Sequence, residues 1–436
     1  MKNRAGKTYY IETWGCQMNI HDSERMSGML RAEGYAETGD PGSADIVILN
    51  TCSIRQKAEQ KFFSQLGLIR RLKKGRPDMK VVVAGCIAQQ EGKGLFRRSP
   101  AVDFVIGPQQ IGAVKDIAGG SAPPVSTGDN PSLPVSEFPA ERMDTIRAWV
   151  TIMYGCDNFC SYCVVPYTRG RERSRPRHDI LREIRDLASQ GFKEVSLLGQ
   201  NVNSYRSDVD FCGLLSEINA VRGIERIRFV TSHPKDFSDG LMTAMAELGK
   251  VCEHIHLPLQ SGSTRVLRLM NRRYGYDEYR RKIDALRKKI PHIAVTSDII
   301  AGFPDETDED HAMTMRALSE LDLDGIFAFR YSPRPGTKAA TMAGQIEESV
   351  KAARLSEILA FQNEVTERKN KQLKGTLQEI LLEGRDSRGT GKLTGRTRTN
   401  KIVNIAPPAD GIVRDFVTVR ITRPYRHSLE GELEIS

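Results

Sequence analysis

The sequence predicts an α/β protein with three parts: an N-terminal Rossmann-like parallel α/β domain, a central partial (βα)6 barrel and a small C-terminal β-barrel. Three observations lead to this prediction. The chain has 436 residues, which is more than one domain usually holds. Apolar β-branched runs alternate with helix-like stretches along most of the chain, as in parallel βαβ units. Beyond Gly375 the pattern changes to short alternating strands and glycine turns, which favours a small barrel.

Three cysteines follow strand-like runs in the predicted N-terminal domain, residues 1–120. They are Cys16, Cys52 and Cys86. Helix-like stretches separate these runs, at residues 22–33 and 53–74. Because the carboxyl ends of parallel strands share one edge of a sheet, where open α/β sheets bind ligands, we expect the cysteines at that edge. The spacing alone leaves open a metal site and three ordinary thiols, since dispersed cysteines carry little signal.

Residues 121–141 are rich in Gly, Ser and Pro, and we predict an interdomain linker there. The central part, residues 142–372, contains strand-like runs separated by helical stretches. These runs are Ala148–Tyr154, Glu194–Leu198, Arg226–Thr231, His254–Leu259, Val295–Ala301 and Gly325–Tyr331. This alternation predicts parallel strands that close part or all of a βα barrel, in which the chemistry lies on the loops after the strands.

The loop after the first of these runs carries Cys156, Cys160 and Cys163 in the spacing Cys-x3-Cys-x2-Cys. We interpret it as a 4Fe–4S site, because each iron of such a cluster takes one ligand and three thiolates leave one iron open to a small molecule. Zinc is the rival metal, but structural zinc has four ligands and catalytic zinc with three usually includes His. Inert thiols are the other alternative, although this polar loop is unlike a buried core.

The chain carries 64 Lys and Arg against 55 Asp and Glu, a net charge of +9. This surplus favours a polyanionic partner, with nucleic acid first. The first ten residues hold no run resembling a signal peptide, and no apolar stretch is long enough to span a membrane, so we expect a cytoplasmic protein without membrane association. Thiols stay reduced there, so the eight cysteines are predicted to include metal ligands. For Cys212 and Cys252 we expect ordinary packing.

Basic residues follow the cluster loop and recur in the C-terminal segment, residues 375–436. A run of arginines is often only solvated, but beside a redox cluster it could bind RNA phosphates through paired hydrogen bonds. For the C-terminal segment the alternative is a basic barrel that docks on its neighbour. We predict contact with RNA or substrate for Arg169, Arg171, Arg173, Arg175, Arg396, Arg398 and Lys401.

The cluster loop resembles that of the radical SAM enzymes, in which S-adenosylmethionine (SAM) binds the open iron and is cleaved to a 5′-deoxyadenosyl radical. The segments around the N-terminal cysteines, residues 15–19, 50–55 and 85–89, are similar to the methylthiotransferases, radical SAM enzymes with two clusters. Residues 375–436 resemble a TRAM domain. The resemblance covers nearly the whole chain. It implies a second, auxiliary 4Fe–4S cluster on Cys16, Cys52 and Cys86, a radical SAM core at residues 142–372 and a terminal barrel that binds RNA.

Three segments point to the branch of this family that acts on tRNA: residues 17–19, 53–55 and 164–170. The implied reaction converts N6-isopentenyladenosine next to the anticodon into its 2-methylthio derivative by radical C–H activation. SAM serves as radical source and as methyl donor. The adenine C–H bond is too inert for acid–base chemistry, so a cofactor radical is required. The resemblance therefore implies a transferase of sulfur-containing groups.

By similarity to radical SAM barrels, residues near the ends of the strands contact SAM. These are Phe159, Tyr162, Gln200, Asn201, Ser232, Gln260 and Ile300. Small polar residues are also common where strands end in turns, so a role in the turn alone remains the alternative. Asp305 departs from the family, where glycine is usual after the proline. His233 and His256 could carry protons or be structural, and we assign them no catalytic step.

The resemblance implies further partners. They are tRNA, bound at its anticodon stem-loop, a low-potential electron donor such as flavodoxin or ferredoxin, and a source of sulfur. We expect a monomer. Two sister activities share both cysteine triplets, one on threonylcarbamoyladenosine in tRNA and one on an aspartate of a ribosomal protein. A basic terminal barrel suits RNA better than a protein loop. The alternative that is not an enzyme is an RNA-binding protein with structural zinc. Anaerobic metal analysis would distinguish the two, since that protein would contain zinc without iron and sulfide.

Overall fold

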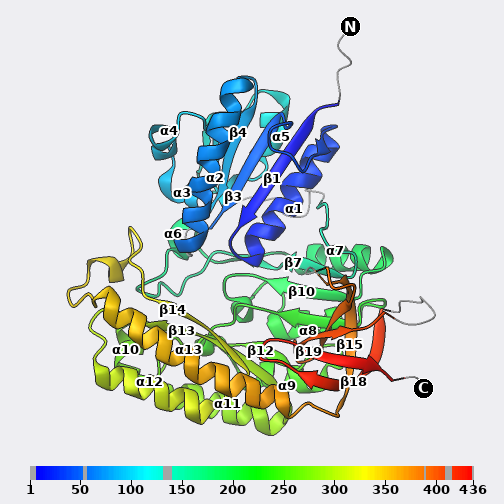
Figure 1. Ribbon diagram of the computed structural model, residues 1–436, viewed down its shortest axis with the longest axis vertical. Coiled ribbons are helices and arrows are strands. Elements are labelled where there is room, and N and C mark those ends of the chain that lie inside the picture. Colours follow the sequence, from blue (N-terminus) through cyan, green and yellow to red (C-terminus); the bar gives the residue numbers. More distant parts are fainter. Residues whose placement is uncertain (1–5, 53–55, 131–139, 387–388, 408–414, 435–436) are drawn as a thin grey trace.

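The computed structural model describes residues 6–52, 56–130, 140–386, 389–407 and 415–434. It contains a parallel α/β domain, a partial βα barrel and a small closed β-barrel, as the sequence predicts (Figure 1). The N-terminal domain lies at one end of the central barrel, and the C-terminal barrel lies against its side. No helix within these ranges is both long and apolar enough to cross a lipid bilayer.

The N-terminal domain is built on six parallel strands in the order β2-β1-β3-β4-β5-β6. The strands are β1 (Thr8–Trp14), β2 (Ala36–Glu37), β3 (Ile46–Thr51), β4 (Lys80–Gly85), β5 (Phe104–Ile106) and β6 (Val125–Ser126). The helices are α1 (Gln17–Ala32), α2 (Gln56–Gly75), α3 (Cys86–Glu91), α4 (Gly94–Arg98) and α5 (Ala113–Gly119), with a 3-10 turn η1 (Pro108–Gln110). Every residue of β3 is buried, because α1 and α5 cover one face and α2 covers the other.

Two boundaries in this domain differ from the sequence prediction. The first helix begins at Gln17 rather than at residue 22, because Cys16 already occupies its N-cap position. β6 lies inside the segment predicted as a linker, where Val125 pairs with Val105 of β5. Residues 53–55, at the start of the second predicted helix, lie outside the described residues. The segment after β5 therefore belongs in part to the sheet.

The central barrel is formed by six parallel strands in two sheets of three. One sheet contains β7 (Arg147–Thr151), β10 (Glu194–Leu198) and β11 (Arg226–Phe229), and the other contains β12 (His254–His256), β13 (Ala294–Ala301) and β14 (Gly325–Arg330). An isolated bridge pairs Ile227 of β11 with Val251, in the segment that leads into β12. The predicted strands are therefore confirmed, although the first run is broken at Ile152 into β7 and β8 (Met153–Tyr154).

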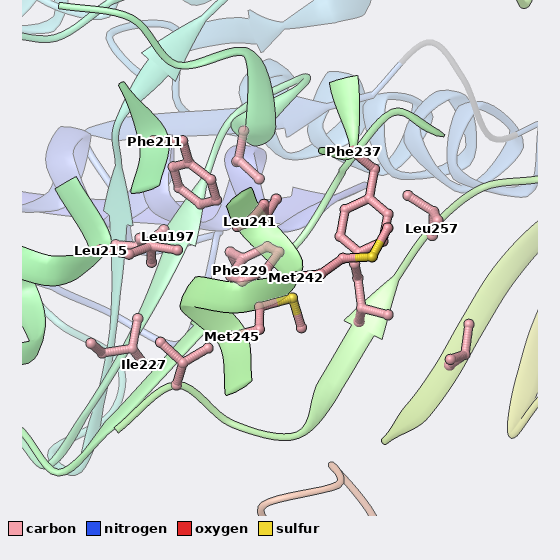
Figure 2. Close-up of a cluster of buried hydrophobic side chains, with 14 of the residues drawn as sticks. Leu197, Phe211, Leu215, Ile227, Phe229, Phe237, Leu241, Met242, Met245 and Leu257 are labelled. Carbon is pink, nitrogen blue, oxygen red and sulfur yellow. The ribbon is translucent and has the colours of Figure 1, made fainter. Parts of the chain in front are cut away.

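Helices pack around the outside of these strands, and Figure 2 shows part of the buried core, with Leu197, Phe229 and Leu241 among its side chains. The helices are α7 (Arg177–Ser189), α8 (Phe211–Asn219), α9 (Asp239–Glu247), α10 (Thr264–Leu269), α11 (Tyr276–Lys289) and α12 (Asp308–Leu321). In α8, for example, Phe211, Leu214 and Ile218 recur at helical spacing and are buried. Short elements at the strand ends are α6 (Val165–Thr168), β9 (Arg173–Ser174), η2 (Val202–Ser204), η3 (Pro234–Asp236) and η4 (Lys338–Thr341).

The long helix α13 (Glu348–Lys371) leads from the central barrel to the C-terminal one. The terminal barrel is closed in the order β15-β16-β17-β19-β18. Its strands are β15 (Leu377–Arg385), β16 (Leu393–Thr397), β17 (Ile402–Ile405), β18 (Phe416–Pro424) and β19 (Leu429–Leu433). The sequence prediction omitted β19, because two glutamates and a glycine interrupt its apolar residues. In the fold, β19 pairs with both β17 and β18 and closes the barrel.

Candidate metal centres

The three N-terminal cysteines meet at the carboxyl ends of neighbouring strands, as predicted. Cys16 follows β1, Cys52 follows β3 and Cys86 follows β4. The thiol of Cys52 is hydrogen-bonded with those of Cys16 and Cys86. No set of three His, Cys, Asp or Glu side chains in the described part of the chain surrounds a single ion. The site therefore consists of three neighbouring thiols, each at the carboxyl end of its own strand.

Two glycines allow the strand ends to come this close. Gly15 has a φ of +144°, and a Cβ added there would lie 2.6 Å from the Cβ of Cys52. Gly85 has a φ of +90°, and its added Cβ would lie 2.5 Å from the carbonyl oxygen of Thr51. Side chains other than hydrogen are excluded by this spacing and disfavoured by the backbone conformation. The glycines before Cys16 and Cys86 therefore make the gathering of the thiols possible.

A buried amide network fixes the backbone beside Cys16. The thiol of Cys16 donates to Oδ1 of Asn19 at 3.2 Å. Nδ2 of Asn19 donates to Oδ1 of Asn50 at 3.1 Å, and Nδ2 of Asn50 donates to Oγ of Ser23 at 2.9 Å. Because buried polar groups are costly without partners, this chain ties the start of α1 to the end of β3.

The electrostatics of this site favour thiolates at two of its three cysteines. The hydrogen bond with the Cys52 thiol lowers the pKa of Cys16 to about 5 and that of Cys86 to about 7. The positive charge of Arg169 lowers both further. The same two hydrogen bonds raise the pKa of Cys52 well above its usual range. Since iron binds thiolates, the donor set fits an iron–sulfur cluster.

Arg169 lies in this site and not on an RNA-facing surface. It follows α6 in the central part of the chain, yet its Nη2 donates to Oδ2 of Asp22 in α1 at 3.0 Å. Both side chains are buried. The RNA contact predicted for Arg169 is not supported by this placement, because the surrounding protein already provides its partners.

The second triplet is held on one loop of the central barrel. The backbone N–H of Ser161 donates to the carbonyl of Met270 at 3.0 Å, and Oγ of Ser161 donates to that of Leu269 at 2.8 Å. Nδ2 of Asn271 donates to the carbonyl of Phe159 at 3.0 Å. The turn after α10 therefore fixes the backbone between the cysteines. Burial raises the pKa of Cys156 to about 11.

Burial likewise raises the pKa of Cys163, to about 12. Arg272, which sequence reasoning missed, lies against this triplet. Its Nη1 is 3.4 Å from Sγ of Cys160 and donates to Oη of Tyr162 at 3.3 Å. Its Nε donates to Oη of Tyr274 at 2.9 Å. More than a hundred residues separate Arg272 from the loop, and no local pattern connects them.

Buried polar atoms without a hydrogen-bond partner lie among the residues predicted to contact SAM. Oε1 of Gln200, Oδ1 of Asn201 and Oγ of Ser232 are buried and have no hydrogen-bond partner among the described residues. They follow the carboxyl ends of β10 and β11. An unpaired buried polar group costs about 1–3 kcal/mol. A ligand with amino, carboxylate and ribose groups would satisfy these atoms, so the donor set fits SAM.

The remaining predicted SAM contacts lie nearby. The main chain of Gln260 donates to the carbonyl of Asp298 at 2.8 Å and accepts from the N–H of Ile300 at 2.9 Å. The side chain of Ile300 packs in a cluster with Tyr162. Phe159 is 37% exposed. The structure therefore brings Tyr162, Gln260 and Ile300 together and leaves Phe159 at the surface.

The two histidines have different surroundings. Burial lowers the pKa of His233 to about 2, and the positive charge of Arg272 acts in the same direction. His233 is therefore neutral near pH 7. Nε2 of His256 lies 3.4 Å from Oδ1 of Asp298, and its Nδ1 shares a hydrogen bond of 3.1 Å with Oγ1 of Thr296. We assign neither histidine a catalytic step.

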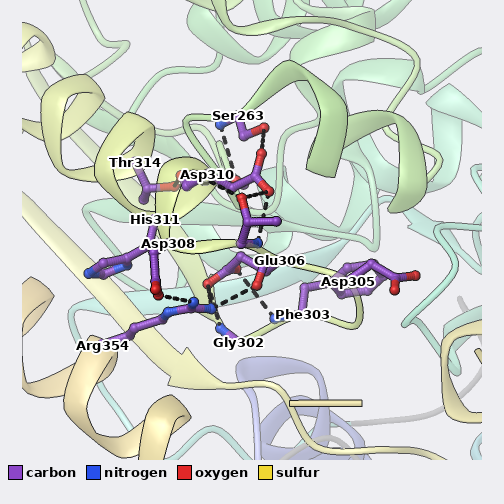
Figure 3. Close-up of polar contacts among 12 residues, drawn as sticks. Ser263, Gly302, Phe303, Asp305, Glu306, Asp308, Asp310, His311, Thr314 and Arg354 are labelled. Carbon is purple, nitrogen blue, oxygen red and sulfur yellow. Dashed lines mark hydrogen bonds and ion pairs between the residues drawn. The ribbon is translucent and has the colours of Figure 1, made fainter. Parts of the chain in front are cut away.

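The loop that contains Asp305 shows why glycine is usual there. Asp305 has a φ of +63°, a left-handed conformation that glycine adopts without strain. The next residue, Glu306, is buried and accepts from the N–H groups of Gly302 at 3.0 Å and Phe303 at 3.3 Å (Figure 3). Nη1 of Arg354 donates to the same carboxylate at 2.9 Å. These bonds fix the loop on both sides of Asp305.

The other arginines after the cluster loop differ in exposure. Nη1 of Arg175 is buried and donates to Oε2 of Glu183 at 2.7 Å. Arg173 is partly buried and donates to the carbonyl of Asn130. The side chain of Arg171 is 72% exposed and pairs with Asp157 at 2.7 Å. Of the predicted RNA contacts on this run, Arg171 is the one that solvent reaches most freely.

In the terminal barrel, the side chains of the three predicted contacts all pair with carboxylates of the protein. Arg398 donates to both carboxylate oxygens of Glu253, at 2.7 and 2.8 Å. Nζ of Lys401 lies 3.5 Å from Asp324. Arg396 pairs with Glu383 within the barrel at 2.9 Å. Arg398 and Lys401 therefore dock the terminal barrel on its neighbour, which is the alternative left open above.

Comparisons with known families cover all three parts of the chain. Residues 8–107 match the uncharacterized protein family UPF0004, residues 150–318 the radical SAM superfamily and residues 371–433 the TRAM domain. The chain is 54% identical to the tRNA-2-methylthio-N(6)-dimethylallyladenosine synthase of Thermodesulfovibrio yellowstonii, over 98% of this chain and 99% of that protein. The same-named protein of Syntrophus aciditrophicus is 47% identical, over 98% and 94%.

Solved structures share the fold. The radical SAM methyltransferase TsrM of Kitasatospora setae, with cobalamin and a [4Fe-4S] cluster bound, aligns with a TM-score of 0.58 at 14% identity, over 77% of each chain. The cobalamin-dependent SAM radical enzyme OxsB aligns with a TM-score of 0.53 at 12% identity, over 83% of this chain and 56% of that chain. These likenesses support the α/β arrangement of the first two parts.

Proposed function

The chain belongs to the tRNA-2-methylthio-N(6)-dimethylallyladenosine synthase family of radical SAM methylthiotransferases, and we propose that it installs the 2-methylthio group on N6-isopentenyladenosine next to the tRNA anticodon. One observation carries the proposal: the fold gathers two separate triplets of cysteines, each beside a buried guanidinium. When bound, two 4Fe–4S clusters and SAM supply the one-electron chemistry that activates the C–H bond and the sulfur and methyl group that replace its hydrogen.

The protein's own residues hold and orient these groups. In the proposal, Cys156, Cys160 and Cys163 bind the radical SAM cluster, and Cys16, Cys52 and Cys86 bind the auxiliary cluster. The orphaned atoms of Gln200, Asn201 and Ser232 bind the polar groups of SAM. Tyr162, Gln260 and Ile300 surround its adenosine.

An exposed aromatic pair beside the cluster loop offers a contact for RNA. Phe159 and Tyr167 are 37% and 58% exposed, and their ring centroids lie 6.2 Å apart. The guanidinium of Arg171 lies 5.6 Å from the centroid of Phe159. Unstacked bases of RNA loops bind to aromatic rings and arginines in this way. We therefore assign Phe159, Tyr167 and Arg171 to the RNA and not to SAM.

The exposed face of β14 favours the isopentenyl substrate over its sisters. Phe327 and Phe329 are 56% and 43% exposed, whereas the alternating Ile326 and Ala328 pack on the core. In the strand register, Phe329 lies beside Ile300 of β13. The two rings therefore line the side of β14 that faces away from the core, next to the proposed SAM site.

This apolar face matches the five-carbon isopentenyl group, whose burial is favourable. A threonylcarbamoyl group carries a carboxylate, which loses its hydration on such a surface. The register also places Asp298 beside Phe327, and its negative charge would repel a second carboxylate. An aspartate side chain of a ribosomal protein meets the same repulsion.

The test uses anaerobically reconstituted protein with SAM, reductant and anticodon stem-loops that carry isopentenyladenosine, threonylcarbamoyladenosine or adenosine. Mass spectrometry of the digested nucleosides should show a methylthio product from the isopentenylated RNA alone. Phe327→Ala should raise the KM for that RNA about tenfold, since it removes part of a buried apolar contact. Leu359→Ala, at an exposed apolar residue of α13, is the matched control. Product from the threonylcarbamoylated RNA would refute the substrate assignment.

The proposal includes partners and boundaries. The tRNA binds at its anticodon stem-loop, a low-potential donor such as flavodoxin or ferredoxin provides electrons, and a separate source provides sulfur. The protein acts as a cytoplasmic monomer. We keep the division into residues 1–120, 142–372 and 375–436, with the linker at 121–141. The match of residues 371–433 to the TRAM domain supports the RNA partner.

A further inference from the structure

One charged side chain of the radical SAM part enters the N-terminal site. Arg169 is 4% exposed, and its guanidinium lies beside the thiols of Cys16 and Cys86. We propose that Arg169 is a positioning residue that holds the negatively charged auxiliary centre against the radical SAM loop and sets the charge around it. This inference rests on the auxiliary cluster of the proposed function and adds to it a role for the second part of the chain.

The first support is a buried ion pair between the two parts of the protein. Nη2 of Arg169 lies 3.0 Å from Oδ2 of Asp22, and both side chains are 4% exposed. Asp22 belongs to α1, the helix that begins directly after Cys16. Removal of one partner from a buried pair leaves an uncompensated charge and is strongly destabilising. The pair therefore ties the helix of the N-terminal site to the loop that follows Cys163.

The second support is independent of charge, because the backbone of Arg169 is also held by the N-terminal domain. Nε2 of Gln109, in η1, donates to the carbonyl of Arg169 at 3.0 Å. The neighbouring Gly170 has a φ of +76°, and a Cβ added there would lie 2.5 Å from the same Nε2. The chain at 169–170 thus fits closely against η1, and the guanidinium has a defined position.

The geometry requires arginine rather than lysine. A guanidinium has several N–H donors in one plane, so it can form hydrogen bonds with Asp22 and the Cys86 sulfur at the same time. The nearby buried Arg25 has a different partner, since its Nη1 donates to Oη of Tyr154 at 2.8 Å. Hydrogen bonds and charges beside the sulfur atoms of an iron–sulfur cluster tune its reduction potential. Arg169 and Asp22 should therefore influence that potential with opposite signs.

The test is a redox titration of the auxiliary centre in full-length protein whose Cys156, Cys160 and Cys163 are changed to Ala, so that a single cluster remains. Arg169→Gln removes a positive charge and should shift the midpoint potential to a more negative value. Asp22→Asn removes a negative charge and should shift it to a more positive value. Arg169→Lys keeps the charge and should give a smaller shift than Arg169→Gln, with a broadened paramagnetic resonance spectrum of the reduced cluster.

The control is Arg142→Lys. Arg142 also bridges the two parts, through Glu24 at 3.1 Å and Glu183 at 2.7 Å, but its hydrogen bonds within the described part of the chain go to imidazole, carboxylate and carbonyl groups and not to a thiol. This variant should lower thermal stability and leave the potential unchanged. Shifts of the same sign in Arg169→Gln and Asp22→Asn, or none in either, would overturn the inference and leave Arg169 a purely structural residue. If Arg169→Gln does not fold, the sign of the Asp22→Asn shift decides. Failure of the parent protein to bind iron and sulfide would instead refute the auxiliary cluster itself.

Discussion

The two cysteine triplets present the same ligands on different supports. Cys156, Cys160 and Cys163 lie on one loop of the central barrel, and their guanidinium neighbour, Arg272, comes from the same barrel. The N-terminal triplet is assembled from three strand ends, and its guanidinium comes from the other part of the chain. The loop site is therefore self-contained, whereas the strand-end site is completed by its neighbour.

The pKa values of the cysteines also differ between the two sites. At the loop site, burial raises the pKa of Cys156 and Cys163. At the strand-end site, a hydrogen bond with Cys52 lowers the pKa of Cys16 and Cys86, and a full positive charge assists. Arg169 has a carboxylate partner, while the hydrogen bonds of Arg272 go to two phenols, a thiol and a backbone carbonyl. A change at one site should thus have little effect on the other, unless it touches Arg169 or its contacts.

The largest expected effects are on SAM cleavage and on product formation, which should be lost separately when the two sites are changed. Cys156→Ala should abolish SAM cleavage, because the open iron that binds SAM depends on that loop. Cys52→Ala should spare SAM cleavage and abolish the methylthio product. Chromatography of 5′-deoxyadenosine and of the modified nucleoside checks both outcomes. Cys212→Ala, outside both triplets, is the control. Equal loss of SAM cleavage in both variants would show that the sites are not independent.

The next effect tests the crowding of the strand ends. Gly85→Ala places a Cβ about 2.5 Å from a backbone oxygen, so we expect a loss of about 2–3 kcal/mol of stability and a protein that keeps the loop cluster but not the auxiliary one. Thermal unfolding and iron content measure these outcomes. Gly34→Ala is the matched control, since Gly34 also has a positive φ, +82°, but nothing within 4 Å of an added Cβ. Equal effects of the two changes would assign the cost to backbone conformation and not to crowding.

A smaller effect is expected at Arg272. Arg272→Lys keeps the positive charge near Cys160 but loses the planar set of donors that reaches Tyr162 and Tyr274. We expect SAM cleavage to slow about tenfold, which corresponds to about 1.4 kcal/mol. The potential of the auxiliary cluster should stay unchanged. Arg268→Lys, at an exposed position of the preceding helix, controls for loss of an arginine. A shift of the auxiliary potential in Arg272→Lys would contradict the separation of the sites.

The smallest effect concerns the loop of Figure 3. Asp305→Gly relieves a left-handed backbone conformation that costs an ordinary residue about 1–2 kcal/mol, and the greater freedom of glycine in the unfolded chain offsets part of the gain. We therefore expect an increase of up to about 1 kcal/mol in the free energy of unfolding, with no change at the auxiliary cluster. Denaturant titration measures this. A decrease would mean that the Asp305 side chain itself stabilises the loop.

Much of the fold follows from local patterns. The six barrel strands and the cysteines after β1, β3 and β4 were predicted, because strand periodicity and residue type are properties of neighbouring residues. β19 was missed because its alternation is interrupted by glycine and glutamate, and its pairing partners, β17 and β18, are what make it a strand. β6 was missed for a similar reason, since two residues become a strand only beside β5.

The sequence by itself placed the candidate ligands: the spacing Cys-x3-Cys-x2-Cys predicts the loop cluster, and the resemblance to the methylthiotransferases implies the cluster on Cys16, Cys52 and Cys86. The roles of the charged residues did require it. Arg169 and Arg171 stand two positions apart, yet one is buried against Asp22 and the other is exposed beside Phe159. Arg398, which looks the same in a list of residues, holds the terminal barrel to Glu253. A thiolate ligand is defined by its own chemistry, whereas the effect of a charge depends on what the folded chain places opposite it and on how much water remains between them.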